Sequence, residues 1–215
     1  LASLPNGGQN ALGTNWDAGD IMYKDLNGDG KIDNGGNKYD DMGDMKKIGN
    51  NTPRYLFGLD LNADYKGFDF RAFFQGVMKR DYWQGSAYFW GATSLWHSTG
   101  FVEHADYFRA EASNDLPANL NAYYPRPVFD SSKNRQRQTA YLQSAAYIRL
   151  KNVQLGYTLP ANLTHKFYVS KLRVFVSGEN LWTGTSLANM FDPETIGGGD
   201  DTDKNGNAYP LSKTI

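Results

Sequence analysis

Oxygen-bearing side chains recur at alternate positions in the segment Asp25-Leu-Asn-Gly-Asp-Gly-Lys-Ile-Asp33. This spacing matches the first nine positions of a calcium loop, in which a glycine at the sixth position allows a sharp turn. No helical pattern flanks the segment, so it is not half of a helical calcium sensor. We expect it to bind a structural Ca²⁺ ion through the side chains of four residues and one carbonyl group: Asp25, Asn27, Asp29, Asp33 and the carbonyl of Lys31.

The acid that would complete such a loop is absent from its twelfth position, where Gly36 stands. Asp40 or Asp41 could replace it at some loss of affinity. The alternative interpretation is a cluster of turns without a metal, because Gly, Asn and Asp favour turns on their own. A fainter copy of the first six positions occurs at 201–206, and there turn formation is the better interpretation.

The composition excludes several classes of function. The chain has 215 residues, a net charge of −1 and no cysteine. A near-neutral chain does not suggest a nucleic-acid partner, and the lack of cysteine excludes thiol chemistry and disulfides. Aromatic residues make up 14% of the chain although its average hydropathy is polar. A transmembrane β-barrel combines these two features, because each strand needs only one apolar face.

Strict alternation of apolar side chains begins after Pro53. Apolar residues occupy every second position from Tyr55 to Tyr65, which predicts a strand with one apolar face. Lys66-Gly67 is a tight-turn signal, and a second alternating run begins at Phe68, so the two runs predict a β-hairpin.

Four strands and the beginning of a fifth are predicted from this alternation. The third strand needs a one-residue bulge near Lys151-Asn152 to keep its apolar positions on one face. The predicted strands cover residues 54–66, 68–77, 143–159 and 170–183, and the last begins at 209–215. Long irregular segments at 1–52, 78–142 and 184–208 separate them from one another or precede them.

The lengths of these strands and loops favour an outer-membrane barrel over a soluble β domain. Strands of soluble domains have about five or six residues, whereas a membrane strand needs about 9–11. Long connections alternate with short ones, as in barrels with extended outer loops and brief periplasmic turns. Because so few strands cannot close a barrel, we expect an all-β, antiparallel transmembrane β-barrel fragment. Its predicted parts are an extracellular loop region at 1–52 and barrel strands with long outer loops at 53–215.

Several motifs, taken in order, resemble the C-terminal part of the barrel in the SusC/RagA family of TonB-dependent outer-membrane transporters. The similarity extends over most of the chain. The motifs are the segment from Gly19 to Asp33, Ile48-Gly49 shortly before Pro53-Arg54-Tyr55, Tyr65-Lys-Gly-Phe-Asp-Phe70 with Phe73-Phe-Gln-Gly76, the segment from Tyr147 to Pro160, Arg173-Val-Phe-Val-Ser-Gly-Glu-Asn-Leu181, and Asp192-Pro-Glu194.

The resemblance implies a function that this stretch shares with the rest of a larger protein. Such a transporter would lie in the outer membrane of a Gram-negative bacterium with its loops on the cell surface. It would import oligosaccharides or peptides, driven by the TonB complex. Its implied partners are a SusD-like surface lipoprotein, the plug and remaining barrel of its own chain, and outer-membrane lipid, but no nucleic acid.

Aromatic residues of the second long segment are candidates for contact with a substrate or a partner. Trp and Tyr offer a large contact area with a polar group, and Trp83, Tyr88, Trp90 and Trp96 are the residues we single out. They could equally pack the segment against itself or lie at the membrane interface.

The polar and titratable residues lead to two further interpretations. Arg149 and Arg173 are expected to line the lumen and to pair with acids such as Asp60, Asp64 or Glu179. His97, Glu103 and His104 lie close in sequence, but they form no known catalytic motif. The chain is therefore predicted not to be an enzyme. The rival hypothesis to a transporter is a soluble, calcium-stabilised β-sandwich that binds carbohydrate.

Overall fold

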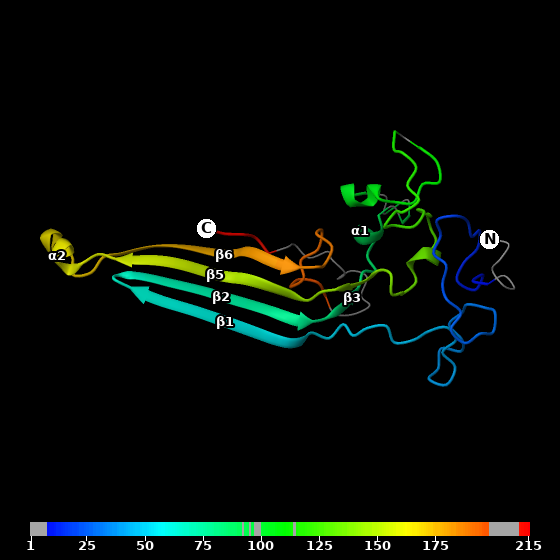
Figure 1. Cartoon of the computed structure of the whole chain (residues 1–215), viewed down its shortest axis with the longest axis horizontal. Helices are drawn as coiled ribbons and strands as arrows, with labels where there is room; N and C mark the ends of the chain where they lie inside the picture. Colours follow the sequence, from blue (N-terminus) through cyan, green and yellow to red (C-terminus); the bar gives the residue numbers. More distant parts are fainter. Residues whose placement is uncertain (1–7, 92, 95, 97–99, 114, 198–210) are drawn as a thin grey trace. The chain divides into compact units, whose positions relative to one another are not determined.

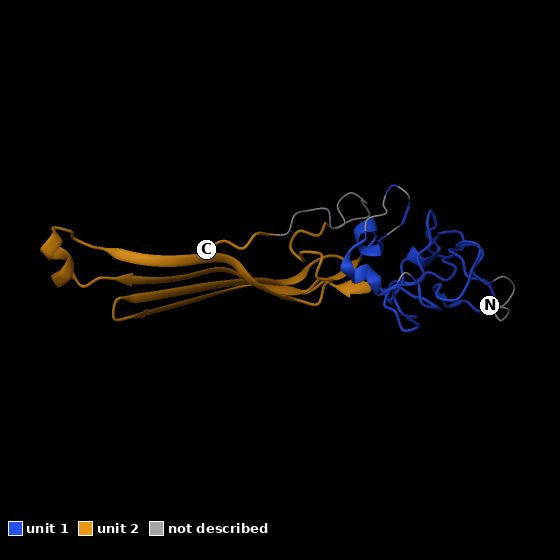
Figure 2. Ribbon diagram, turned by 90° about the horizontal axis from the view of Figure 1, so that it is seen from above, with its two compact units in different colours: residues 1–48, 84–141 blue, residues 49–83, 142–215 orange. Residues whose placement is uncertain are grey.

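The computed structural model describes residues 8–91, 93–94, 96, 100–113, 115–197 and 211–215. The chain divides into two compact units (Figure 2), which are described separately. Unit 1 contains residues 1–48 and 84–141, and unit 2 contains residues 49–83 and 142–215. The sequence predicts a division near residue 53, whereas the contacts in the structure join the long segment at 1–48 to the long segment at 84–141.

Unit 2 is built on an antiparallel sheet of four strands in the order β1-β2-β5-β6 (Figure 1). Its strands have 12 or 13 residues, which is long enough to cross a bilayer at a tilt. They are β1 (Arg54–Tyr65), β2 (Phe68–Lys79), β5 (Tyr147–Thr158) and β6 (Arg173–Thr185). The short strands β3 (Asp81–Trp83) and β4 (Leu142–Ser144) form a second, two-stranded sheet.

The third predicted strand, 143–159, is interrupted in the structure. Its first residues belong to β4, and β5 begins only at Tyr147. Between them the backbone N–H of Ala145 donates a hydrogen bond to the carbonyl of Arg80, and Ala145 is fully buried. Arg80 itself separates β2 from β3. The pairing of β2 with β5 therefore gives way to the pairing of β3 with β4 at the level of Arg80 and Ala145. The alternating pattern alone carries no sign of this exchange.

The predicted bulge is confirmed at Lys151. The pairing of β5 with β2 passes from Leu150 opposite Phe74 to Asn152 opposite Phe73, so Lys151 has no partner on that side. A register shift between Leu150 and Asn152 also occurs in the pairing with β6. The extra residue restores the apolar positions of β5 to a single face.

The fifth predicted strand lies partly outside the described residues. Positions 209–210 belong to that part of the chain, as does the faint loop motif at 201–206. Among residues 211–215, Thr214 forms an isolated antiparallel bridge with Glu179 of β6. Its backbone groups exchange two hydrogen bonds of 2.8 and 3.1 Å with those of Glu179.

One face of the four-stranded sheet is apolar and exposed. Leu61 of β1 stands opposite Ala72 of β2, which stands opposite Val153 of β5. Apolar side chains next to this row on the same face are partly exposed: Leu59 (48% exposed), Phe70 (40%), Leu155 (48%), Val174 (61%) and Val176 (57%). A sandwich would bury this face under a second sheet, and no second sheet covers it in the described part of unit 2.

The opposite face of the sheet carries ion pairs between neighbouring strands. The Arg71 guanidinium binds both carboxylate oxygens of Asp60 at 2.6 and 3.1 Å. Arg173 pairs with Asp69 through two hydrogen bonds and also donates to Gln154. The expected pairing of Arg173 with Asp60, Asp64 or Glu179 is therefore wrong. Asp69 and Arg173 flank Gly156 from the two neighbouring strands, which explains why they meet.

Arg149 holds the segment that follows β6 against the sheet. Its guanidinium donates to Asp192 and to Glu194, both at 2.7 Å, and to the Thr183 hydroxyl at 2.8 Å. The predicted acidic partners of Arg149 are thus replaced by the acids of the Asp192-Pro-Glu194 motif. Lys151 adds a bond to Glu194 at 3.0 Å, so the bulge residue also belongs to this network.

The connections at one end of the strands are short. Lys66 and Gly67 both have positive φ angles, 45° and 88°, as a two-residue hairpin turn requires. Residues 159–172 join β5 to β6 and contain the single-turn helix α2 (Ala161–Thr164) and a 3₁₀ turn (His165–Phe167). The Gly67 carbonyl accepts a hydrogen bond from the Thr158 N–H, which ties the hairpin turn to the end of β5.

Unit 1 has little regular structure. Its described residues contain the helix α1 (Ala87–Trp90) and two 3₁₀ turns, Val102–Ala105 and Lys133–Arg135. None of the helices in the described residues of either unit has the length and hydrophobicity of a membrane-spanning helix. Unit 1 must therefore be stabilised by side-chain contacts between its two long segments.

Candidate functional site

A buried cluster of charges joins the two segments of unit 1. The side chains of Asp20 and Lys133 are each only 2% exposed, and Lys133 Nζ lies 2.8 Å from Asp20 Oδ2. Arg126 binds the same oxygen at 2.8 Å, and Asn134 donates to Oδ1 at 2.9 Å. Burial alone would raise the pKa of Asp20, but these hydrogen bonds outweigh it and lower the pKa to about 2.

The peptide groups around Asp20 continue the connection between the segments. Asn134 accepts the Ile21 N–H at 2.9 Å, and Lys133 accepts the Tyr23 hydroxyl through its carbonyl at 2.6 Å. The buried Gln9 amide binds the backbone of Ile21 and Tyr23 on the other side. Residues 9–23 are therefore fixed against residues 126–134 by polar contacts.

An aromatic core lies in the second segment. Phe89 is fully buried and contacts the rings of Trp90, Tyr124 and Tyr141 at centroid distances of 5.2–6.2 Å. Trp90 also packs on Tyr141 at 4.9 Å. This arrangement agrees with the interpretation in which the aromatic residues pack the segment against itself.

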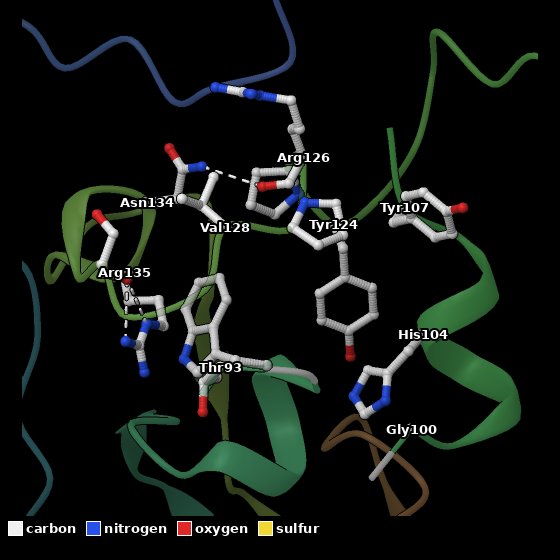
Figure 3. Close-up of a pocket in the computed structure, with 13 residues that line it drawn as sticks. Thr93, Gly100, His104, Tyr107, Tyr124, Arg126, Val128, Asn134 and Arg135 are labelled. Atoms are coloured by element: carbon white, nitrogen blue, oxygen red, sulfur yellow. Dashed lines mark hydrogen bonds between the residues drawn. The ribbon is translucent and has the colours of Figure 1, made fainter. Parts of the chain in front are cut away.

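A cavity of about 200 Å³ opens beside this aromatic core, entirely within unit 1 (Figure 3). Its walls combine ring-bearing side chains with polar and charged groups. The residues that line it include Trp90, Thr93, His104, Tyr107, Tyr124, Pro125, Arg126, Pro127, Asn134 and Arg135. Small-molecule sites combine such apolar walls with a small number of oriented polar groups, so this cavity is the candidate binding site.

The polar groups of the cavity differ in whether their hydrogen-bonding atoms are already engaged within the protein. His104 is engaged at both ring nitrogens, since Nδ1 accepts the Phe101 N–H at 2.9 Å and Nε2 lies 3.0 Å from the Phe89 carbonyl. Tyr124 is 7% exposed, and its hydroxyl has no hydrogen-bond partner among the described residues. Burial, followed by neighbouring tyrosines and acids, raises the pKa of Tyr124, so it stays a neutral donor.

Arg135 brings a cation to the wall of the cavity. Its Nε and Nη2 atoms donate to the Ser131 carbonyl at 3.2 and 3.0 Å. Burial lowers the pKa of Arg135, although the nearby charge of Asp130 opposes the shift. Among the described residues, no acidic side chain lines the cavity, so this lining favours neutral or anionic ligands over cations.

Trp90 is the one predicted contact residue that reaches the cavity. Its indole N–H donates to the Gln84 carbonyl at 2.8 Å, which fixes the ring. Tyr88 is 46% exposed and lies beside Phe101, and Trp96 is 92% exposed. Trp83 belongs to β3 in unit 2 and is half-buried. His97, which is close in sequence to Glu103 and His104, lies outside the described residues.

The predicted metal loop has the turns of such a loop, but its acids bind the backbone. Gly28 and Gly30 both have φ of +79°. Asp25 accepts the N–H groups of Gly28 at 2.6 Å and of Gly30 at 2.9 Å. Asn27, Asp29 and Asp33 each accept an N–H two residues further along. The Lys31 N–H is the one that binds Asp29.

Asp44 closes the loop, in place of the residues that the sequence suggested. Its carboxylate accepts the N–H groups of Leu26 at 2.5 Å and of Asp33 at 3.0 Å, whereas Asp41 binds Gly36. Within the described residues, no three His, Cys, Asp or Glu side chains are gathered closely enough to hold a metal ion. The arrangement is that of a closed turn, and an ion would have to draw these carboxylates together.

Sequence reasoning missed Asp44 and most of the cavity. Asp44 is eleven positions beyond Asp33, so no loop spacing indicates it. The run Tyr-Tyr-Pro-Arg-Pro at 123–127 was visible in the sequence and supplies four of the lining residues, namely Tyr124, Pro125, Arg126 and Pro127. Proline and aromatic rings in such a run are the signal that could have pointed to this wall.

The comparisons with known proteins agree with the architecture. No family model matches the chain. TonB-dependent receptor P3 of Formosa agariphila is 32% identical over 178 residues, which are 83% of this chain and 16% of that protein. TonB-dependent receptor P26 of the same organism is 28% identical over 82% of this chain and 16% of its own length.

A solved structure shares the fold. The RagAB peptide importer in its "closed-closed" state matches with a TM-score of 0.51 and 23% identity over 79% of this chain and 17% of that chain. The curated relatives are receptors, which is consistent with the prediction that the chain is not an enzyme. The motifs, the sheet and the relatives agree, so this chain is homologous to the TonB-dependent receptors of the SusC/RagA type, and its four long strands form part of a barrel of that kind.

Proposed function

We propose that the complete protein is an active transporter in the outer membrane of a Gram-negative bacterium. It imports oligosaccharides or peptides and takes its energy from the TonB complex. The chain spans 16% of the length of the curated relatives it matches, so this activity belongs to the whole protein. The plug and the region that contacts TonB would lie elsewhere in that protein.

The observation that carries the proposal is the division of the sheet into two different faces. Leu59, Phe70 and Val174 are 40–61% exposed on one face, while Arg71 and Arg173 form ion pairs on the other. Exposure of a four-stranded apolar face to water is unfavourable, whereas contact of such a face with lipid is favourable. The charged face would then line the lumen.

The long segments would lie on the cell surface and meet a SusD-like lipoprotein. The connections at 66–67 and 159–172 are short, and all the long segments leave the sheet from the other strand ends. Barrels of the outer membrane keep short turns on the periplasmic side and long loops outside. This asymmetry supports the orientation, and the exposed rings of Tyr88 and Trp96 offer contact area to the lipoprotein.

The cavity of unit 1 would bind one ring of the imported molecule. Trp90, Tyr107 and Tyr124 supply flat apolar walls, and the Tyr124 hydroxyl and Arg135 supply donors. Both a sugar ring and the side chain of a peptide can use such a surface. Trp83 would contact the substrate or the lipoprotein from unit 2.

Ca²⁺ would stiffen the loop at 25–33. The donor atoms of Asp25, Asn27, Asp29, Asp33 and the Lys31 carbonyl are oxygens, which calcium prefers. Asp44 already bridges the two ends of the loop and is the acid best placed to complete the site. Ion binding would exchange some of the present N–H contacts for coordination bonds.

Uptake by cells tests the proposed function. Cells that express the complete protein with its lipoprotein partner should accumulate fluorescent oligosaccharides or peptides when TonB is present, and should lose uptake when TonB is deleted. Uptake that persists without TonB would contradict active transport. Fractionation that places the protein outside the outer membrane would contradict the proposal altogether.

A further inference from the structure

The short connections of unit 2 carry exposed apolar side chains that no part of the described chain covers. Tyr168 is fully exposed and has a left-handed backbone with φ of 60°. Phe167 is 76% exposed and Leu163 is 46% exposed. At the end of β1, directly before the neighbouring hairpin turn, Tyr65 is 70% exposed. Large apolar side chains that are exposed together mark a site of contact.

The same connections are basic. From Asn152 to Gly178 the chain contains no acidic residue, yet it contains Lys166 and Lys171, both of which are exposed. Lys66 lies on the hairpin turn, with its ammonium group 5.2 Å from the centre of the Tyr65 ring. We call Lys66, Lys166, Lys171, Tyr65, Phe167 and Tyr168 the turn-end surface.

The nearby acids neutralise only part of the positive charge of this surface. Two acids, Asp64 and Asp69, stand against the three lysines and Arg173, and the charge of Asp69 acts on Lys171 as well as on Arg173. Asp69 is bound by Arg173 through both of its oxygens. Asp64 stands opposite Asp69 on the neighbouring strand and is the remaining acid at this end of the hairpin. The surface therefore keeps an excess of positive charge beside exposed rings.

The turn-end surface continues directly into the apolar face of the sheet. Tyr65 stands opposite Phe68 in the register of β1 and β2, and Phe68 stands opposite Tyr157 of β5 with ring centres 4.5 Å apart. Phe68 is 51% exposed and belongs to the face that is directed to lipid in the proposed function. A surface that begins where the hydrocarbon ends lies at the level of the lipid headgroups.

We propose that the turn-end surface binds the headgroups of anionic phospholipids. The rings of Phe167 and Tyr168 enter the boundary between headgroups and acyl chains, and the ammonium groups of Lys166 and Lys171 pair with lipid phosphates. Aromatic side chains favour this boundary because they are apolar with a polar edge. Lysine near an anionic leaflet gains about fivefold in affinity per charge. The proposal rests on the proposed membrane location of the sheet.

The test compares two double variants of the complete transporter in detergent. The variant Lys166→Gln/Lys171→Gln removes two charges from the turn-end surface, and Lys46→Gln/Lys47→Gln removes two exposed charges from unit 1 as a matched control. Binding of dioleoylphosphatidylglycerol and of dioleoylphosphatidylcholine is measured by native mass spectrometry. The unaltered protein and the control should prefer the anionic lipid. The Lys166→Gln/Lys171→Gln variant should bind it about 25-fold more weakly, with phosphatidylcholine unchanged.

Two results would overturn the inference. Equal affinity of the unaltered protein for the two lipids would do so, as would equal losses in the two double variants. Insertion of the same preparations into vesicles separates this inference from the proposed function. A transporter that inserts but does not distinguish the lipids contradicts only the headgroup site, whereas failure to insert contradicts the membrane location as well.

Discussion

Buried charged side chains connect the two segments of unit 1. Asp20 accepts hydrogen bonds from Arg126, Lys133 and Asn134, and its environment lowers its pKa from 3.8 to about 2. A carboxyl group with a lowered pKa stabilises the fold above its ordinary pKa and loses that contribution as the pH falls through the folded value. The stability of residues 9–23 should therefore decrease between about pH 4 and pH 2.

Replacement of Asp20 by asparagine tests this contribution. The change leaves Lys133 buried without its counter-ion, which typically costs about 3–5 kcal/mol. Hydrogen exchange at the amides of Ile21 and Tyr23, measured in the complete protein, should show faster local opening near neutral pH. The dependence on pH between 4 and 2 should vanish in the variant.

The exposed Asp17 provides the control for that experiment. Asp17→Asn should change exchange at both amides and its pH dependence far less than Asp20→Asn does. The Asp17 carboxylate accepts the Ala18 N–H and acts on Arg126 only through its charge, and the backbone N–H that Asp17 donates to Asp20 is retained in the variant. Equal effects of the two substitutions would show that the Asp20 network does not hold the segments together.

The loop at 25–33 gives a second prediction at the scale of the residue. Ca²⁺ should protect residues 24–45 of the complete protein from proteolysis, and a chelator should reverse the protection. Asp25→Asn and Asp44→Asn should each abolish the effect, whereas Asp40→Asn should not, because Asp44 and not Asp40 closes the loop. Equal cleavage with and without calcium would leave the loop as a set of turns.

The strands of the sheet could be predicted because their signal is local. Alternation from Tyr55 to Tyr65, the Lys66-Gly67 turn and the bulge at Lys151 are properties of a few consecutive residues, and each has its counterpart in the structure. The break between β4 and β5 could not be predicted in this way. It depends on the Arg80 carbonyl, which lies 65 positions from Ala145 in the sequence.

Close packing of β2 against its neighbours makes Gly76 sensitive to substitution. A Cβ atom there would collide with the Tyr147 carbonyl and come within 2.7 Å of the Phe57 ring. Gly76→Ala should therefore lower the free energy of unfolding in detergent by about 1–3 kcal/mol. Thermal unfolding monitored by circular dichroism would measure the change.

Gly58→Ala is the matched control, since it lies on the adjacent strand and makes the same chemical change. Its new Cβ would approach the ring of Phe73 at 3.3 Å, and a side chain can move whereas a ladder carbonyl cannot. Comparable destabilisation by the two substitutions would mean that the β2–β5 spacing is not the cause.

At the scale of the whole molecule, the association of the two segments of unit 1 could not be predicted from the sequence. Its two segments, 1–48 and 84–141, are separated in the chain by the β1–β2 hairpin and have no periodic pattern. The contacts that join them are individual hydrogen bonds, such as Lys133 Nζ to the Asn15 carbonyl at 2.8 Å. The candidate cavity depends on this assembly, and for that reason Trp90 was the only one of its residues chosen in advance as a contact.

The direction of the two faces of the sheet is the central claim, and adjacent residues of β5 test it most directly. The described chain has no cysteine, so Leu155→Cys on the apolar face and Gln154→Cys on the charged face can each carry a bimane label in a cysteine-free form of the complete protein. After reconstitution in vesicles of brominated lipid, the label at 155 should be strongly quenched and the label at 154 should not. Quenching that is equal at the two positions, or stronger at 154, would contradict a barrel wall with Leu155 in lipid.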